Sequence, residues 1–191
     1  KGDPNQYGPA WPTIRRLVLQ RDNFTCQACG QLERDQPFHV HHKTPFRSFA
    51  SAEQANQMEN LVTLCPVCHK KAEASILIRS GLSGLSYVLQ NLSPLFIMCD
   101  ISDLGAHSDP LSPLAEKQPV VILYDMIPAG IGLSEALYDL HDDLLSRSLE
   151  LVTNCSCHNG CPSCVGPAGI NGVGGKEETL ALLSFLCEKN D

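Results

Sequence analysis

Long hydrophobic runs are missing from this sequence. Every apolar stretch falls short of the roughly 18 consecutive residues that a membrane helix requires, so we expect no membrane partner. No charged segment followed by an apolar one comes after Lys1, and a secretory signal is therefore not expected. Internal repeats are also lacking. The 191 residues, 43% of them hydrophobic, predict one large packed domain or two small ones.

Cysteine, in contrast, is abundant. Ten cysteines in a short secreted protein would suggest disulfides, but eight of them fall into two compact clusters. This clustering favours metal binding in a reducing compartment and hence a cytoplasmic protein. Cys99 and Cys187 stand alone in apolar surroundings, where we interpret them as buried thiols without a ligand role.

The first cluster consists of two CxxC pairs. Each pair presents two sulfur atoms from one turn, and four thiolates with no open position are typical of a structural zinc site. CPVCH at 65–69 also matches a c-type haem attachment motif, but no export signal is present and a second CxxC is available to share a metal. We therefore expect zinc, which would stabilise a core too small to stand alone. The expected ligands are Cys26, Cys29, Cys65 and Cys68.

The second cluster has the pattern CxCxxxCxxC. Gly160 and Pro162 supply the tight backbone that folds four thiolates around one ion. A redox CxxC is the rival interpretation of CPSC, but two further cysteines so close favour a closed zinc site. The expected ligands are Cys155, Cys157, Cys161 and Cys164.

Charge is unevenly distributed along the chain. The net charge of −7 argues at first against a nucleic-acid partner. Residues 10–80, however, hold nine Lys/Arg against six Asp/Glu, whereas residues 81–191 hold four against fourteen. Phosphate contacts are therefore expected in the first part, and the change of charge predicts the domain boundary. Residues 1–9 form a polar lead-in.

Periodicity predicts strand, loop, strand and helix in the basic part, after a first helix over 11–20. A strand-like alternation surrounds Phe38 to Thr44, a polar loop covers 47–59, a second strand covers 61–64, and a helix runs over 65–78.

The acidic part predicts a small α/β domain. We expect a helix over 81–92, a buried strand over 93–100, a Pro/Ser-rich connection over 102–118 and a strand over 120–124. A long amphipathic helix should follow from about 133, and a last helix should cover 176–189.

The segment FHVHHKTPFRSFASAEQANQMENLVTLCPVCHKKAE follows the first CxxC pair and contains the second. It resembles the HNH endonuclease family of ββα-metal nucleases. The resemblance implies that His42 is the general base that takes a proton from water, and that His41 and His69 are metal ligands. It also implies that Asn60 holds the two strands together and orients the base. Glu73 lies one helical turn after His69 and could complete the ligand set.

The resemblance implies a catalytic divalent cation beside the two structural zinc ions. Magnesium or manganese would tolerate the carboxylate of Glu73, whereas zinc or nickel prefers more imidazole. Lys43, Arg47, Lys70 and Lys71 flank the site and are candidates for phosphate contact. His39 lies on the same strand face as His41, where an accessory role and a structural one are equally open. The alternative for all the histidines is that they only pack around the zinc in a non-catalytic module.

A second resemblance covers most of residues 81–191. MCDISDLG, VVILYDMIPAGIGL and CSCHNGCPSCV are similar to the C-terminal zinc-binding domain of MrfA-like DEAD/DEAH-box DNA helicases. This implies a helicase motor in the same polypeptide or as a separate subunit, and a role in DNA repair; HNH nucleases also serve phage defence. GVGGKEE falls short of a P-loop, so no nucleotide site is expected in this chain.

Together these observations predict an α+β protein, with a zinc-stapled ββα-metal HNH module over 10–80 and an α/β zinc-binding domain over 81–191. The expected function is metal-dependent hydrolysis of DNA phosphodiester bonds by an HNH-type endonuclease, as part or partner of a helicase. The alternative is a zinc-binding adaptor that binds DNA or a partner without cleaving it.

Overall fold

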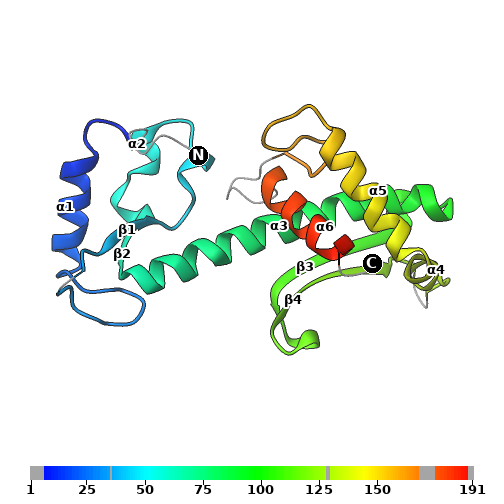
Figure 1. The fold of residues 1–191 in the computed structure, drawn as a ribbon, viewed down its shortest axis with the longest axis horizontal. Coiled ribbons are helices and arrows are strands. Elements are labelled where there is room, and N and C mark those ends of the chain that lie inside the picture. The colour runs from blue at the N-terminus through cyan, green and yellow to red at the C-terminus, as the bar shows by residue number, and fades with distance from the viewer. Residues whose placement is uncertain (1–6, 35, 128–129, 168–174, 189–191) are drawn as a thin grey trace. The chain divides into compact units, whose positions relative to one another are not determined.

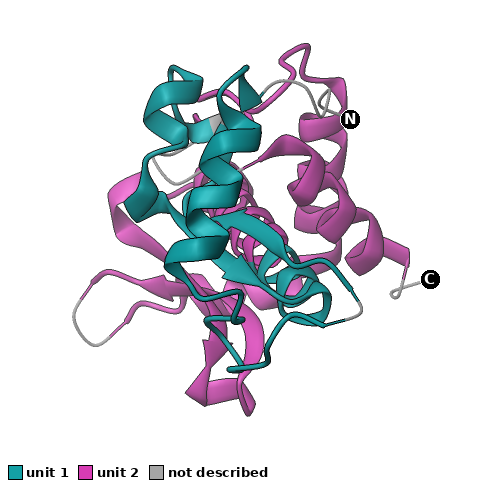
Figure 2. Cartoon of the chain, turned by 90° about the vertical axis from the view of Figure 1, so that its left-hand side faces the viewer, with its two compact units in different colours: residues 1–75, 170–172 teal, residues 76–169, 173–191 magenta. Residues whose placement is uncertain are grey.

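The computed structural model describes residues 7–34, 36–127, 130–167 and 175–188. The chain divides into two compact units between Ser75 and Ile76, inside one long helix (Figures 1 and 2). The change of charge predicted the division a few residues later, before Gly81. Each unit has its own hydrophobic core.

The first unit contains the predicted order of strand, loop, strand and helix. Its elements are α1 (Trp11–Arg21), β1 (His39–His42), η2 (Phe46–Ser48), α2 (Ala52–Ala55), η3 (Met58–Asn60), β2 (Leu61–Leu64) and the start of α3 (Pro66–Ile97). The predicted loop over 47–59 therefore contains short helical turns. The core residues are Val18, Leu19, Cys26, Phe38, Val40, Leu61, Leu64 and Cys65.

Strands β1 and β2 pair in antiparallel register, with His39 opposite Leu64 and His42 opposite Leu61. Side chains alternate along a strand. His39 and His41 therefore lie on one face of β1, whereas Val40 and His42 lie on the other and are buried. This alternation decides which histidines can act together.

A charged group fastens the end of α1 to β2. The carboxylate of Asp22 accepts hydrogen bonds from the Arg21 guanidinium at 2.8 and 3.0 Å, and from the Thr63 backbone N–H at 2.9 Å. Arg21 also donates to the carbonyl oxygens of Met58 and Leu61. Burial raises the pKa of Asp22, but these bonds outweigh it and the pKa lies below its usual value. The carboxylate thus stays charged and holds the small core closed.

The second unit is a mixture of helices and one β-hairpin. Beyond α3 its elements are η4 (Ile101–Asp103), β3 (Leu104–Ser112), η5 (Pro113–Ala115), β4 (Gln118–Asp125), α4 (Leu133–Asp139), α5 (His141–Asn154) and α6 (Lys176–Glu188). Its buried core residues are Leu85, Val88, Leu89, Leu104, Leu137, Leu144, Val152, Cys164, Val165 and Leu183. The mixed α+β class predicted from the sequence is confirmed.

The predicted buried strand over 93–100 is wrong, because α3 continues to Ile97. Apolar side chains at helical spacing run through this stretch, and Leu92, Phe96 and Ile97 pack against the core. Pro94 is accommodated inside the helix, and the hydroxyl of the preceding Ser93 donates to the Leu89 carbonyl oxygen at 2.6 Å. Burial of the stripe outweighs the local cost of the proline.

The predicted connection over 102–118 instead contains β3, which pairs antiparallel with β4. Its polar and proline residues are tolerated because each strand of a two-stranded sheet has a free edge. Gly105 lies opposite Tyr124, and a Cβ atom at Gly105 would collide with the tyrosine ring. The long helix expected from residue 133 is divided into α4 and α5 at Leu140.

Helices α3 and α6 approach each other closely in the second unit. A Cβ atom at Gly84 would lie 3.2 Å from the Cβ atoms of Thr179 and Val165, and one at Gly81 would lie 2.7 Å from Leu182. Thr179 is fully buried. Glycine is therefore needed in α3 for this packing. None of the described helices is long and apolar enough to cross a membrane.

Candidate metal centres

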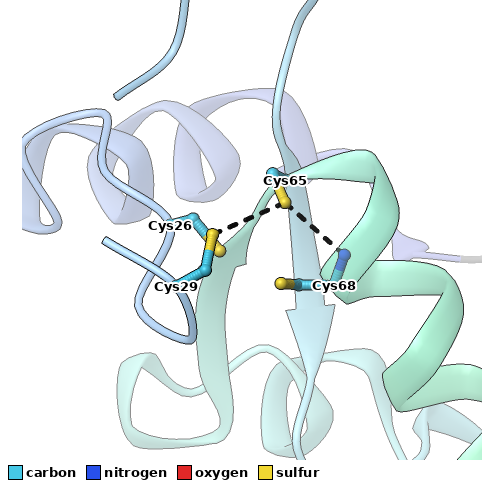
Figure 3. A group of neighbouring side chains, drawn as sticks. All are labelled: Cys26, Cys29, Cys65 and Cys68. Carbon is cyan, nitrogen blue, oxygen red and sulfur yellow. Dashed lines mark hydrogen bonds between the residues drawn. The ribbon is translucent and has the colours of Figure 1, made fainter. Parts of the chain in front are cut away.

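The first four-cysteine group joins the turn after α1 to the end of β2 and the first turn of α3. Gly30, with φ of +74°, allows the chain to turn back after Cys29. The four sulfur atoms all lie within 4.8 Å of one another, with 3.9 Å between the Sγ atoms of Cys29 and Cys65 (Figure 3). A tetrahedral zinc with bonds of about 2.3 Å places its sulfurs about 3.8 Å apart. The group therefore fits zinc.

The thiols of this group influence one another strongly. Burial raises the pKa of Cys26, but backbone N–H groups of Cys65 and Cys29 lower it to about 6. The neighbouring Cys65 thiol raises the pKa of Cys68 to about 12. Four thiols this close share their protons unevenly, and a bound dication replaces those protons.

The second group lies between α5 and the start of α6. Sulfur–sulfur distances are 3.6 Å between Cys155 and Cys157, and 3.5 Å from Cys161 to both Cys155 and Cys164. These values are also close to those of a tetrahedral thiolate site. The protein thus has two four-cysteine zinc-binding sites, one in each unit, at the predicted residues.

A separate cluster of histidines lies where β1 faces α3. The His69 ring stacks on His39 with centroids 4.8 Å apart, and meets His41 edge-on at 5.1 Å. Glu73, one turn along α3, places a carboxylate oxygen 3.6 Å from His69 Nδ1. The structure therefore brings together three of the predicted metal-site residues, with His39 beside them.

Burial lowers the pKa of both His41 and His69, and the carboxylate of Glu73 only partly offsets this. The neutral imidazole, which can bind a metal, is thereby favoured. Among the described residues, only the two cysteine groups have three or more donor atoms within 4.8 Å of one another. Side-chain rotation would be needed for His41, His69 and Glu73 to hold one ion.

His42 lies on the opposite face of β1 and has different neighbours. Its side chain stacks against Tyr7 and Trp11, with centroids 5.3 and 5.2 Å away, and only 8% of the residue is exposed. Its Nε2 lies 2.9 Å from Asn56 Oδ1. Burial lowers the pKa of His42, opposed by the hydrogen bond to Asn56. The structure does not place His42 among the predicted metal ligands.

Asn60 connects the segment after β1 to the segment before β2. Its side-chain oxygen accepts from the Thr44 N–H at 2.8 Å, and its amide donates to the carbonyls of Thr44 and Ala55. Its own carbonyl accepts from the Lys43 N–H at 2.8 Å. Asn60 thus fixes the shape of the chain on both sides of the histidines.

The predicted phosphate contacts vary in their surroundings. Lys70 and Lys71 are exposed on α3. The Lys43 ammonium donates to the Glu59 carbonyl oxygen at 2.8 Å and is exposed. The side chain of Arg47 lies outside the described part of the structure.

Sequence reasoning missed the surroundings of His42. Tyr7 falls in a stretch interpreted as a polar lead-in, and Asn56 in one interpreted as a loop. No local pattern marks either residue, because each meets His42 only through the tertiary fold.

Comparison with known families assigns each unit. The HNH endonuclease family model matches residues 26–75, which include the first zinc site and the histidine cluster. The MrfA Zn-binding domain model matches residues 85–165, which include the second zinc site. The chain therefore contains one region similar to HNH endonucleases and another similar to MrfA Zn-binding domains.

Proteins similar to this chain include helicases. The uncharacterized ATP-dependent helicase YprA of Bacillus subtilis is 41% identical over 105 residues, which are 55% of this chain and 14% of YprA. A crystal structure of the DUF1998 helicase MrfA bound to DNA has a TM-score of 0.52 and 38% identity, covering 58% of this chain and 14% of MrfA. The chain thus spans about a seventh of these relatives. An uncharacterized Methanocaldococcus jannaschii protein, MJ1572.1, is 32% identical over 84 residues, 43% of this chain and 75% of that protein.

Proposed function

We propose that this chain is a metal-dependent endonuclease that hydrolyses DNA phosphodiester bonds. The observation that carries the proposal is the grouping of His41, His69 and Glu73 where β1 faces α3, within a unit of the HNH endonuclease family. Two imidazoles and a carboxylate form a donor set that suits a divalent cation: the carboxylate is compatible with manganese or magnesium, and the imidazoles with zinc or nickel.

The residues divide the chemistry between them. A bound cation would neutralise the charge that develops on the phosphate and lower the pKa of a water ligand. His41 and His69 are kept neutral by burial, as metal-binding imidazoles must be, and Glu73, with a carboxylate oxygen 3.6 Å from His69 Nδ1, is the third proposed ligand. Asn60 fixes the segment that follows His42, the proposed general base. Lys43, Lys70 and Lys71 are exposed for contact with DNA phosphates, and Arg47 is a further candidate.

The proposed partner is a DNA helicase motor, in the same polypeptide or as a separate subunit. The second unit belongs to the MrfA Zn-binding domain family, and its relatives YprA and MrfA are helicases about seven times its matched length. MrfA has been crystallised bound to DNA. In this proposal the second unit links the nuclease to the motor, in DNA repair or in phage defence.

One observation favours a different function. His42 is buried and lies on the opposite face of β1 from the proposed ligands. A general base must reach the water from which it takes a proton. The second candidate is therefore a non-catalytic zinc-binding adaptor, in which the histidines only complete the fold and the chain binds DNA or its partner.

Plasmid and single-strand cleavage by the purified chain separates the two functions. The reactions contain magnesium, manganese, nickel or zinc, and compare the wild type with His41→Ala, His42→Ala and His69→Ala. His107→Ala is the matched control, because His107 is an exposed histidine on β3 in the other unit. The zinc content of each variant verifies that both cysteine sites are intact.

If the chain is an endonuclease, we expect metal-dependent nicking whose rate falls roughly 100-fold or more in all three variants and is unchanged in the control. Cleavage that survives His42→Ala would remove His42 as the base. Absence of cleavage with every ion, together with DNA binding, would support the adaptor.

A further inference from the structure

Lys176 is a buried cation in an acidic unit. It is the first residue of α6 and only 9% exposed, whereas the other described Lys and Arg residues of the second unit, Arg79, Lys117 and Arg147, are exposed. A buried lysine is destabilising unless its charge is compensated. No carboxylate accepts a hydrogen bond from Lys176 among the described contacts.

The partners of Lys176 are the carbonyl oxygens of two cysteines of the second zinc site. Its ammonium donates to the Cys155 carbonyl and, at 3.0 Å, to the Cys157 carbonyl. Zinc bound by four thiolates carries a net charge of about −2. The positive charge is therefore held next to a group of opposite charge.

We propose that Lys176 is the electrostatic anchor of the second zinc site, and that zinc binding there secures α6 to the cysteine loop. This role is independent of DNA cleavage. Lys176 offsets the charge of the zinc–thiolate group and holds the backbone of Cys155 and Cys157 in the bound geometry. The zinc in turn compensates the ammonium, so that each stabilises the other.

The first zinc site serves as an internal control. Within the described residues, no Lys or Arg side chain donates to the carbonyls of its four cysteines. Removing the charge at Lys176 should consequently weaken the second site and leave the first unchanged.

The test measures zinc release to a colorimetric chelator from the full chain, using Lys176→Met, Lys176→Arg and Lys117→Met. Lys176→Met keeps the length of the side chain without its charge, and Lys117→Met is a matched change at an exposed lysine of the same unit. Cys26→Ser and Cys161→Ser chains identify which release phase belongs to which site.

We expect zinc release from the second site to accelerate roughly 10–100-fold in Lys176→Met, as for other residues that support metal ligands from outside the coordination sphere. Lys176→Arg should restore slow release, and Lys117→Met should match the wild type. Unchanged release from the second site in Lys176→Met would overturn the proposal. Equal acceleration at both sites would overturn it too, because it would indicate general unfolding.

A second inference concerns Asn56 and rests on the proposed endonuclease function. Asn56 Nδ2 donates to the Tyr7 carbonyl oxygen at 2.7 Å, and a carbonyl can only accept. The amide is thereby oriented with Oδ1 towards His42 Nε2, which lies 2.9 Å away. Because Oδ1 is also only an acceptor, the proton of the neutral ring must be on Nε2.

We infer that Asn56 is a positioning residue, which selects the His42 tautomer with a bare Nδ1. Nδ1 is then the atom that takes the proton from water, and Asn56 holds the ring through its hydrogen bond with Nε2. Stacking of Tyr7 and Trp11 on the ring limits its rotation.

The tautomer is measured by two-dimensional NMR of the histidine ring nitrogens in the zinc-loaded chain, beside cleavage kinetics of Asn56→Leu. Asn91→Leu is the control, because Asn91 also donates its amide to a tyrosine carbonyl, that of Tyr87. We expect Nε2–H in the wild type and a mixture of tautomers in Asn56→Leu, with kcat lowered roughly 100-fold and KM little changed.

An Nδ1–H tautomer in the wild type, or an unchanged tautomer in Asn56→Leu, would overturn the positioning role. A wild-type chain with the Nε2–H tautomer but no cleavage would refute the endonuclease, and with it the catalytic use of Nδ1. If Asn56→Leu loses zinc or fails to fold, Asn56→Ser provides the comparison, because a hydroxyl can both donate and accept and so does not select one tautomer.

Discussion

The proposed roles of the individual histidines differ because their neighbours in the fold differ, not because their sequence contexts do. His41 and His42 are adjacent in sequence, yet strand alternation sends one towards His69 and the other into an aromatic pocket with Asn56. His39 occupies the same face as His41 and stacks on His69. The residue whose role the sequence left open is thus in contact with the proposed metal ligands.

His39 is expected to orient the His69 ring by stacking. His39→Ala should weaken manganese binding by roughly 10-fold, and His39→Phe should largely restore it, because the flat ring is kept and the nitrogen atoms are lost. Calorimetric titration of the zinc-loaded chain with manganese provides the measurement. If His39→Phe binds manganese as weakly as His39→Ala, His39 is a ligand and not a stacking partner.

Asp125 illustrates a carboxylate with a structural role. It accepts hydrogen bonds from the backbone N–H groups of Ile131, Gly132, Leu133 and Ser134, at 2.7 to 3.2 Å. The bonds from Ile131 and Ser134 lower its pKa to about 2. These four bonds tie the end of β4 to the start of α4.

The stabilisation by Asp125 should depend on pH in one direction. The pKa of Asp125 is lower in the folded chain than in the unfolded chain, where it is about 3.9. The resulting stabilisation is fully present at pH values above about 3.9, and it disappears as the pH falls through about 2. Urea midpoints of wild type and Asp125→Asn should therefore differ by a constant amount from pH 8 to pH 5. The difference should shrink only below about pH 4. Both chains contain the same zinc sites, so a difference that varies between pH 8 and pH 5 would contradict this assignment.

At the scale of elements, the contact between α3 and α6 organises the second unit. It depends on Gly81 and Gly84, which the sequence presented only as part of a helical segment. Extension of α3 to Ile97 and formation of β3 are likewise products of packing. Pro94 disfavours a helix locally, and the polar residues of 102–112 disfavour a strand. Burial of the shared core outweighs these local preferences.

Gly84→Val should destabilise the second unit by about 1–3 kcal/mol, because the added atoms meet the buried Thr179 and Val165 side chains. Gly130→Val is not a suitable control, since Gly130 has a φ of +67°. Ser86→Val, at a half-buried position of the same helix, is suitable. Thermal unfolding followed by circular dichroism measures the change, and equal stability of the two variants would refute the close-packing argument.

At the scale of the whole molecule, each of the two small cores includes cysteines of a four-cysteine zinc-binding site. A structural zinc contributes about 10–16 kcal/mol of apparent binding free energy at neutral pH, as much as the total stability of an ordinary domain. Chelation should therefore unfold both units. Adding zinc back to the reduced chain should restore them.

Because each unit has its own core, the loss of one zinc should leave the other unit folded. Cys161→Ser should release one zinc and remove the helical signal of the second unit. The first unit should keep its zinc and its amide resonances. Loss of both zinc ions in Cys161→Ser would show that the units fold together, contrary to this expectation.

The sequence by itself determined the features that depend on short spacing. These features are both four-cysteine sites, the strand–loop–strand–helix order and the mixed α+β class. They follow from cysteine pairs and local periodicity, which do not depend on how the rest of the chain packs.

The tertiary structure alone decided which side chains meet across long intervals. Tyr7 reaches Asn56 and His42, Lys176 reaches the cysteine loop, and Gly84 meets Thr179. These contacts are made by folding two cores, and no local pattern encodes them. The physical reason is that burial is a property of the whole packed unit, whereas spacing belongs to a few neighbouring residues.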